Sequence, residues 1–201
     1  FHKDLLKFKE RLQFEALYGG RHTQFYELSF KGDRLAGSPF WMDSQFLYAI
    51  RSSERFAGMG NDGSATFRNK MDPRSSNTIA RYSEDVGGIT YKIGYGFGEK
   101  KPTYKIGAYF TYVNQEFSGA RRGGRHTDSS IEKVYDTKKL PGFEDDVQLY
   151  EIGGNFSFNL LDLEGQPSEG SKFDMFVGNV PPQNGFQYWH YGFDSKIYFN
   201  L

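Results

Sequence analysis

The final stretch of the chain, YWHYGFDSKIYFNL at residues 188–201, alternates between two kinds of side chain. The large apolar residues share one face, interrupted only by Ser195: Trp189, Tyr191, Phe193, Ile197, Phe199 and Leu201. The other face carries His190, Gly192, Asp194, Lys196 and Asn200, together with Tyr188 and Tyr198. A period of two is typical of a β-strand whose two faces meet different surroundings. An aromatic, uncharged face opposite a charged one favours a strand of a transmembrane barrel, apolar outward and polar inward.

The same alternation recurs in seven further segments, which predicts eight antiparallel strands: residues 11–16, 26–30, 40–51, 88–97, 103–113, 148–160 and 172–178. We therefore expect an all-β, up-and-down transmembrane β-barrel domain over residues 10–201. The residues expected to face lipid most clearly are Tyr91, Ile93, Tyr95, Phe110, Phe156, Trp189, Tyr191, Phe193, Ile197 and Phe199. A charge on that face would cost about 2–4 kcal/mol near the membrane midplane, which explains why charges are missing there.

Composition agrees with this class. Aromatic residues make up 18% of the chain and there are 24 glycines, although the mean hydropathy is −0.67. An all-β soluble sandwich also alternates, but its apolar sides are seldom so aromatic or so free of charge. No apolar run approaches the roughly 20 residues that a membrane-spanning helix needs. Lys+Arg and Asp+Glu both number 25, which predicts no nucleic-acid partner, and there is no cysteine for a disulfide.

Connection lengths predict the topology. Gly32–Pro39, Gly98–Pro102 and Asp162–Gly170 are short, whereas Ser52–Val86 and Ser118–Asp145 are long and polar. Bacterial outer-membrane barrels have short periplasmic turns and long extracellular loops. We therefore expect an outer-membrane protein with both chain ends in the periplasm, residues 1–9 forming a short periplasmic segment. Lipids and lipopolysaccharide are its expected partners. Because the first ten residues are charged throughout and show no signal peptide, we interpret the chain as a mature or trimmed form.

Two motifs resemble the BamA-type outer-membrane assembly barrels and their bacterial surface-antigen relatives. Residues 54–62, ERFAGMGND, resemble the R-F-x-G-x-G-N stretch after the third strand of that family, through Arg55, Phe56, Gly58, Gly60 and Asn61. Residues 158–170, FNLLDLEGQPSEG, resemble its Y-D-T-R-D turn and the P-x-x-G that follows, through Asp162, Pro167 and Gly170. Asn159, Leu160 and Leu161 depart from that second motif and remove charged groups from it.

The resemblance covers about residues 11–201, but only the first eight of the family's sixteen strands. The POTRA domains, the second eight strands and the V-R-G-F loop of the family are absent from this sequence. The resemblance thus implies a barrel fold and a structural, transport or assembly-type role. The resemblance is weaker evidence that this chain inserts or secretes other proteins, because function resides in sites rather than in folds. One half of a longer assembly or secretion barrel is an alternative interpretation.

Candidate chemistry is sparse. His190 lies on the polar face with Asp194, and an acid–base pair would require a carboxylate from a neighbouring strand, such as Asp174. The segment Asn61–Ser64 resembles part of a calcium loop but lacks the closing Glu. We therefore predict no enzyme, no metal and no cofactor. A small lipid-modifying enzyme of the outer membrane is the alternative, with His190 and Asp174 as its first candidates.

Two closures satisfy the predicted strands. The last strand pairs with the first of its own chain, giving a narrow barrel filled by the inward Phe25, Trp41, Tyr109, Phe176 and Tyr188. Otherwise it pairs with the first strand of a second copy, giving a sixteen-stranded barrel from two chains. Both pairings are antiparallel, so parity does not decide between them. The resemblance to half of a sixteen-stranded family favours the homodimer.

Overall fold

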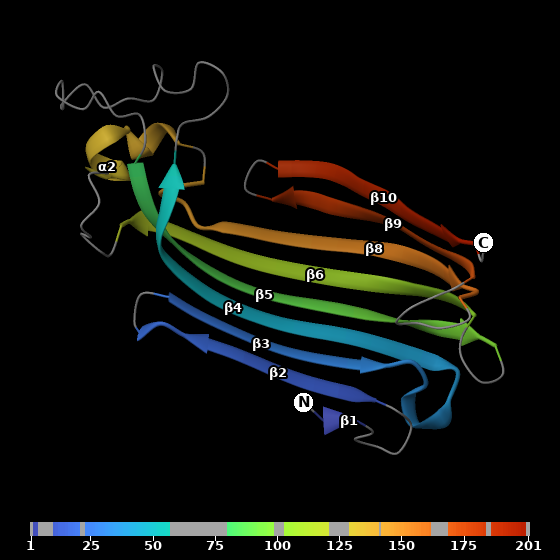
Figure 1. Ribbon diagram of the computed structural model, residues 1–201. Coiled ribbons are helices and arrows are strands. Elements are labelled where there is room, and N and C mark those ends of the chain that lie inside the picture. Colours follow the sequence, from blue (N-terminus) through green and yellow to red (C-terminus); the bar gives the residue numbers. More distant parts are fainter. Residues whose placement is uncertain are drawn as a thin grey trace.

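The computed structural model of the chain is one antiparallel β-sheet (Figure 1). It describes residues 2–3, 10–20, 23–56, 80–98, 103–120, 129–140, 142–161, 169–183 and 186–199. The strands lie side by side in the order β1 (His2–Lys3), β2 (Arg11–Tyr18), β3 (Thr23–Gly32), β4 (Phe40–Phe56), β5 (Ala80–Phe97), β6 (Tyr104–Gly119), β8 (Val147–Asn159), β9 (Gly170–Gln183) and β10 (Phe186–Tyr198). The short β7 (Ser129–Ser130) pairs with β5 in parallel. The predicted all-β, antiparallel, up-and-down class is confirmed.

The eight predicted strands correspond to β2, β3, β4, β5, β6, β8, β9 and β10. The sheet itself is open. Over the described residues β10 pairs with β9 alone, and β2 pairs with β3 and the two residues of β1. Figure 1 places β2 and β10 at opposite margins of a curved sheet. Pairing of β1 with Leu12 and Arg11 also brings part of the segment 1–9 against the sheet edge.

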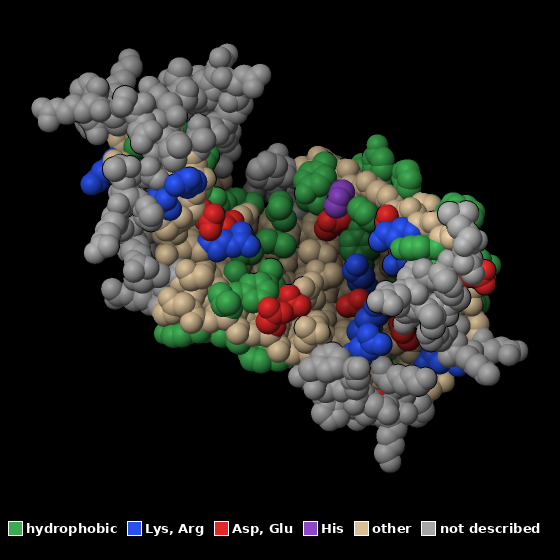
Figure 2. Space-filling model, in the orientation of Figure 1, with side chains coloured by type: hydrophobic (Ala, Val, Ile, Leu, Met, Phe, Trp, Pro, Cys, Tyr) green, Lys and Arg blue, Asp and Glu red, His purple; other side chains and the backbone are tan. Residues whose placement is uncertain are grey.

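One row of directly opposed residues crosses all eight long strands and defines the polar face of the sheet. It runs Arg11, Lys31, Asp43, Lys92, Tyr109, Gly153, Gly178, His190. Since opposed residues share a face, the alternation predicted in each strand is in phase across the sheet. We call this the hollow face. Figure 2 shows it hollowed over the middle strands, with acids, bases and the histidine gathered on it.

Three strands extend into the two long loops that the sequence predicted. β4 continues to Phe56, β5 begins at Ala80 and β6 continues to Gly119, so strand residues occupy both ends of the predicted loop Ser52–Val86 and the start of Ser118–Asp145. A register shift between Arg51 and Glu54 interrupts the pairing of β4 with β5. An extra residue at such a bulge changes the phase of the alternation, which hid this extension in the sequence.

The largest cluster of buried apolar residues lies at one end of the sheet, where β4 ends and β5 begins. Ile131 and Val134 of α2 (Ile131–Val134) pack with Ala80, Tyr135 and Leu140, and Phe56, Tyr82 and Phe143 lie against them. The short helix η3 (Thr137–Lys139) completes this region, which we call the cap, residues 129–140 with Phe143. Figure 1 shows α2 at the extended ends of β5 and β6. The predicted second loop therefore holds a small folded unit.

No helix in the described ranges is both long enough and apolar enough to cross a membrane.

Candidate functional site

Three aromatic rings on the hollow face lie close against glycines of other strands. A Cβ on Gly107 would lie 2.5 Å from the Trp41 ring, and one on Gly153 would lie 2.5 Å from the Tyr109 ring. A Cβ on Gly192 would lie 2.8 Å from Phe176. Real Cβ atoms do not approach other atoms so closely, so a larger residue at these positions would require its neighbours to shift. The glycines on this face thus create the room in which its rings and polar groups are placed.

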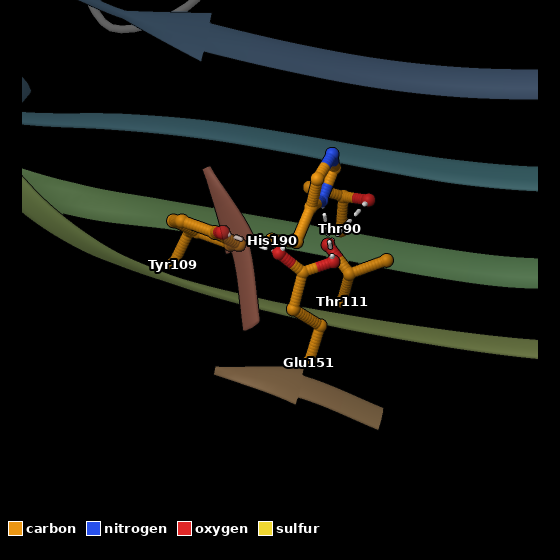
Figure 3. A network of polar contacts seen from close by, with 5 residues as sticks. All are labelled: Thr90, Tyr109, Thr111, Glu151 and His190. Atoms are coloured by element: carbon orange, nitrogen blue, oxygen red, sulfur yellow. Dashed lines mark hydrogen bonds and ion pairs between the residues drawn. The ribbon is translucent and has the colours of Figure 1, made fainter. Parts of the chain in front are cut away.

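Tyr109 and His190 converge on the carboxylate of Glu151 from two sides (Figure 3). The Tyr109 hydroxyl on β6 donates a hydrogen bond to Oε1 of Glu151 on β8. Nδ1 of His190 on β10 lies 3.3 Å from the same oxygen and 3.5 Å from Oε2. His190 reaches over β9 because its opposed residue there, Gly178, has no side chain. Three strands are linked by one carboxylate.

The exposure of this network is uneven. The Glu151 side chain is 17% exposed, whereas that of His190 is 53% exposed. The edge of the His190 ring also contacts Phe176, with centroids 4.8 Å apart. Beside the network, the hydroxyls of Thr90 and Thr111 lie 3.3 Å apart, and Thr111 is directly opposite Glu151. A carboxylate that orients an accessible imidazole is an arrangement used for acid–base chemistry.

Asp174, named above as an example of a carboxylate that could pair with His190, is not its partner in the described residues. Asp174 lies opposite Asp194 and forms an ion pair with Lys172, 2.8 Å away on its own strand. Asp194 pairs in the same way with Lys196, at 3.2 Å. These pairs run along the strands because the residues opposite one another carry like charges. No signal in the sequence alone identifies Glu151, since its contact with His190 depends on the register of three strands.

A second polar group lies on the hollow face near the turn between β3 and β4. Nζ of Lys105 is 2.6 Å from Oδ1 of Asp33 and 5.6 Å from the centre of the buried Trp41 ring. Burial raises the pKa of Asp33, but the hydrogen bond and charge of Lys105 outweigh it, with help from Lys31 and Arg11. The pKa of Asp33 therefore lies below its ordinary value, and the ion pair persists at neutral pH.

The residues expected to face lipid all lie on the outer face of the sheet, opposite the hollow face. Nine of them are among the exposed large hydrophobic residues, and Phe156 is half-buried between its neighbours. Tyr191 and Phe193 on β10 are the most open, each at 78% exposure. No second layer covers this face in the part of the chain that the structure describes.

The family-motif residues divide into two groups. Arg55 and Phe56 end β4, where the Phe56 ring contacts Tyr135 of the cap with centroids 5.0 Å apart. Gly170 begins β9 with a φ of +114°, a conformation that L side chains rarely adopt. Gly58, Gly60, Asn61, Asp162 and Pro167 lie outside the described residues, as does the segment Asn61–Ser64. Within the described ranges, no group of three His, Asp or Glu side chains has the geometry to hold a metal ion.

No protein-family model matches this chain, and no curated protein matches it either.

Proposed function

We propose that the chain is a bacterial outer-membrane β-barrel protein with a structural, transport or assembly-type role, whose eight long strands cross the membrane. The observation that carries this proposal is the uncovered outer face, which is apolar and aromatic while the hollow face holds the charges. Water-soluble monomers rarely expose large contiguous apolar patches. In a bilayer the same face needs no second layer, because lipid covers it.

The height of the charge-free band supports this proposal. On β5 the outward residues from Ile89 to Phe97 carry no charge, and the next outward acid is Asp85. Nine residues tilted by 35–45° rise about 20 Å, close to the roughly 25 Å apolar band of outer-membrane barrels. Aromatic residues lie at both ends of the band, as Tyr104 and Tyr112 do on β6. Such rings form the girdles at the two membrane interfaces.

The resemblance of the segments 54–62 and 158–170 to the BamA-type barrels supports a structural, transport or assembly-type role. The direct test is to express the chain in a bacterium with an outer membrane and fractionate the envelope. We expect it in the outer-membrane fraction, resistant to carbonate extraction, and migrating differently on a denaturing gel before and after heating. Recovery in a soluble fraction, or release by carbonate, would contradict the proposal.

The hydrogen bond between Glu151 and His190 favours one further candidate, a small lipid-modifying enzyme of the outer membrane. In the described residues His190 is bonded to Glu151 alone, so no hydroxyl is held against the imidazole as a nucleophile. The test measures lipid hydrolysis and acyl transfer in outer-membrane vesicles carrying the protein or His190→Ala. Activity that is lost in His190→Ala would support an enzyme, and equal activity in both samples would exclude this role for His190.

A further inference from the structure

The two margins of the sheet differ in how much of their edge is free. On β2, the residues Arg11 and Leu12 already pair with Lys3 and His2 of β1. Gln13–Tyr18 has no strand beside it in the described chain, and neither does the outer edge of β10. In a bilayer every backbone N–H and C=O needs a partner, so both edges must be paired if the sheet spans the membrane as proposed. The strands that pair with them must also fit the register of a closed barrel. We call the stagger the number of residues by which the register is displaced along the strands after eight strands have been crossed.

The stagger follows from strand geometry. Eight strands spaced about 4.8 Å apart and tilted by 35–45° accumulate an offset of about 8–12 residues. The offset is even, because inward residues must meet inward residues. Its direction comes from the row that starts at Arg11, the first residue of β2, and meets β10 at His190, eight residues before the end of that strand. From β2 to β10 the row therefore moves away from the end of the barrel at which β2 begins. A β2 strand that pairs with β10 must then lie opposite His190 with a residue beyond Arg11.

Three registers are therefore available, and the position opposite Glu15 distinguishes them. Lys196 lies six positions beyond His190, so a stagger of ten brings it four positions beyond Arg11, opposite Glu15. A stagger of eight places Asp194 opposite Glu15, which sets two like charges against each other. A stagger of twelve places Tyr198 there and moves Lys196 opposite Leu17. Only the stagger of ten joins an acid to a base.

Glu15 needs such a base. It lies directly opposite Glu27 on β3, and neither carboxylate has an ion pair or hydrogen bond with any described residue. Opposed like charges destabilise a strand pair. Lys196 is available, because its pair with Asp194 is more than half exposed on both sides and such pairs contribute little.

The length of the free edge selects the same register. With a stagger of ten, the last six residues of β10, Phe193–Tyr198, lie opposite the six free residues Gln13–Tyr18. β10 then ends where β1 begins, so both fit along β2. A stagger of eight would bring Tyr198 opposite Arg11, where Lys3 already pairs. On the outer face, a stagger of ten sets Ile197 against Phe14 and Phe193 against Tyr18, while the small Ser195 meets Ala16.

We propose that β10 of one copy pairs with β2 of a second copy in this register, so that Lys196 of each chain lies opposite Glu15 of its partner. This inference rests on the proposed membrane role. The second copy is favoured over closure within one chain because the sheet is curved too little. Closure of eight strands would bring β2 and β10 within about 4.8 Å, whereas they lie at opposite margins (Figure 1). Two copies related by a twofold axis form two identical seams and leave no free edge.

The test uses cysteine pairs, since the chain has no cysteine of its own. Glu15→Cys with Lys196→Cys is oxidised in outer membranes and compared with Glu15→Cys plus Asp194→Cys and Glu15→Cys plus Tyr198→Cys. Directly opposed residues are about 5 Å apart and can form a disulfide, whereas diagonal neighbours at 7–8 Å are too distant. We expect a band at twice the monomer mass from the first pair only. Co-expression of two differently tagged chains, each with one of these cysteines, should link both tags.

A second measurement does not depend on disulfide geometry. Glu15→Lys should reduce the amount of dimer that survives in detergent, and Glu15→Lys with Lys196→Glu should restore it. Carbonate resistance is measured on every variant, so that failure to reach the membrane is separated from failure to pair. Membrane-integrated protein that crosslinks only within one chain, or through the Asp194 or Tyr198 pair, would overturn the inference. Loss of membrane integration in the unaltered chain would overturn the proposed function along with it.

Discussion

The ring of Tyr109 lies across Gly153, and its hydroxyl meets the carboxylate of Glu151 two residues along the same strand. Gly153 is directly opposite Tyr109 in the pairing of β6 with β8. The absence of a side chain at one position therefore decides where the neighbouring ring lies. That ring in turn determines which polar group the carboxylate binds.

Gly153→Ala should destabilise the folded sheet. The added Cβ would collide with the backbone carbonyl oxygen of Val177 on β9 and lie 2.5 Å from the Tyr109 ring, and crowding of this kind costs about 1–3 kcal/mol. Gly154→Ala is the matched control, since a Cβ there meets nothing closer than 3.6 Å. The measurement is the denaturant midpoint of the heat-modifiable form in detergent. Equal midpoints for the two variants would contradict the close packing of Tyr109 and of the β9 backbone around Gly153.

Ile93→Lys should block stable membrane insertion, as should Phe193→Lys. Both side chains lie on the outer face, and a lysine near the midplane costs about 2–4 kcal/mol. Lys92→Ala and Asp194→Ala change the neighbouring positions on the hollow face and should be far milder. Yields of heat-modifiable barrel are compared on a gel. Equal yields from all four variants would contradict the assignment of the two faces.

The ion pair between Asp33 and Lys105 should make stability depend on acid pH. The pKa of Asp33 is lower in the folded protein than its ordinary value near 3.8. Its contribution is thus complete above that ordinary value and is lost as the pH falls through the lowered one. Asp33→Asn should remove this dependence and leave a small loss at pH 7, below about 1 kcal/mol because Asp33 is half exposed. Unfolding midpoints between pH 2 and 7 test it, with Asp136→Asn in the cap as control.

Tyr135→Ala should loosen the cap without unfolding the sheet. Tyr135 is buried against Phe56 at the end of β4, and truncation of a buried ring costs about 3–5 kcal/mol. A protease added to intact cells should then cut near residues 129–140 faster than in the unaltered protein, since we expect both long connections outside the cell. The short connection after Phe97 should remain uncut. Cleavage that requires a broken outer membrane would invert the topology.

The alternation of apolar and polar residues predicted most of the sheet, because over the predicted segments each strand has one polar face and one face without charge. Even Phe156 and Trp189, on different strands, fall on the predicted side. Alternation within a strand does not determine the register between strands, so the contact of His190 with Glu151 could not be predicted. The end of β4 was missed because the irregularity after Arg51 breaks the alternation. The cap was missed because α2 is four residues long and shows no helical period.

The packing around Tyr135 has a calorimetric consequence. Apolar side chains of the cap bury one another. Melting the cap therefore exposes apolar surface to water and increases the heat capacity. The outer face of the sheet faces lipid in the proposed setting and gains no such hydration when the strands separate within the bilayer. Most of the heat-capacity increment of unfolding in membranes should therefore come from these few residues beyond the strand ends. Scanning calorimetry of the protein in membranes would therefore report mainly on the melting of the cap.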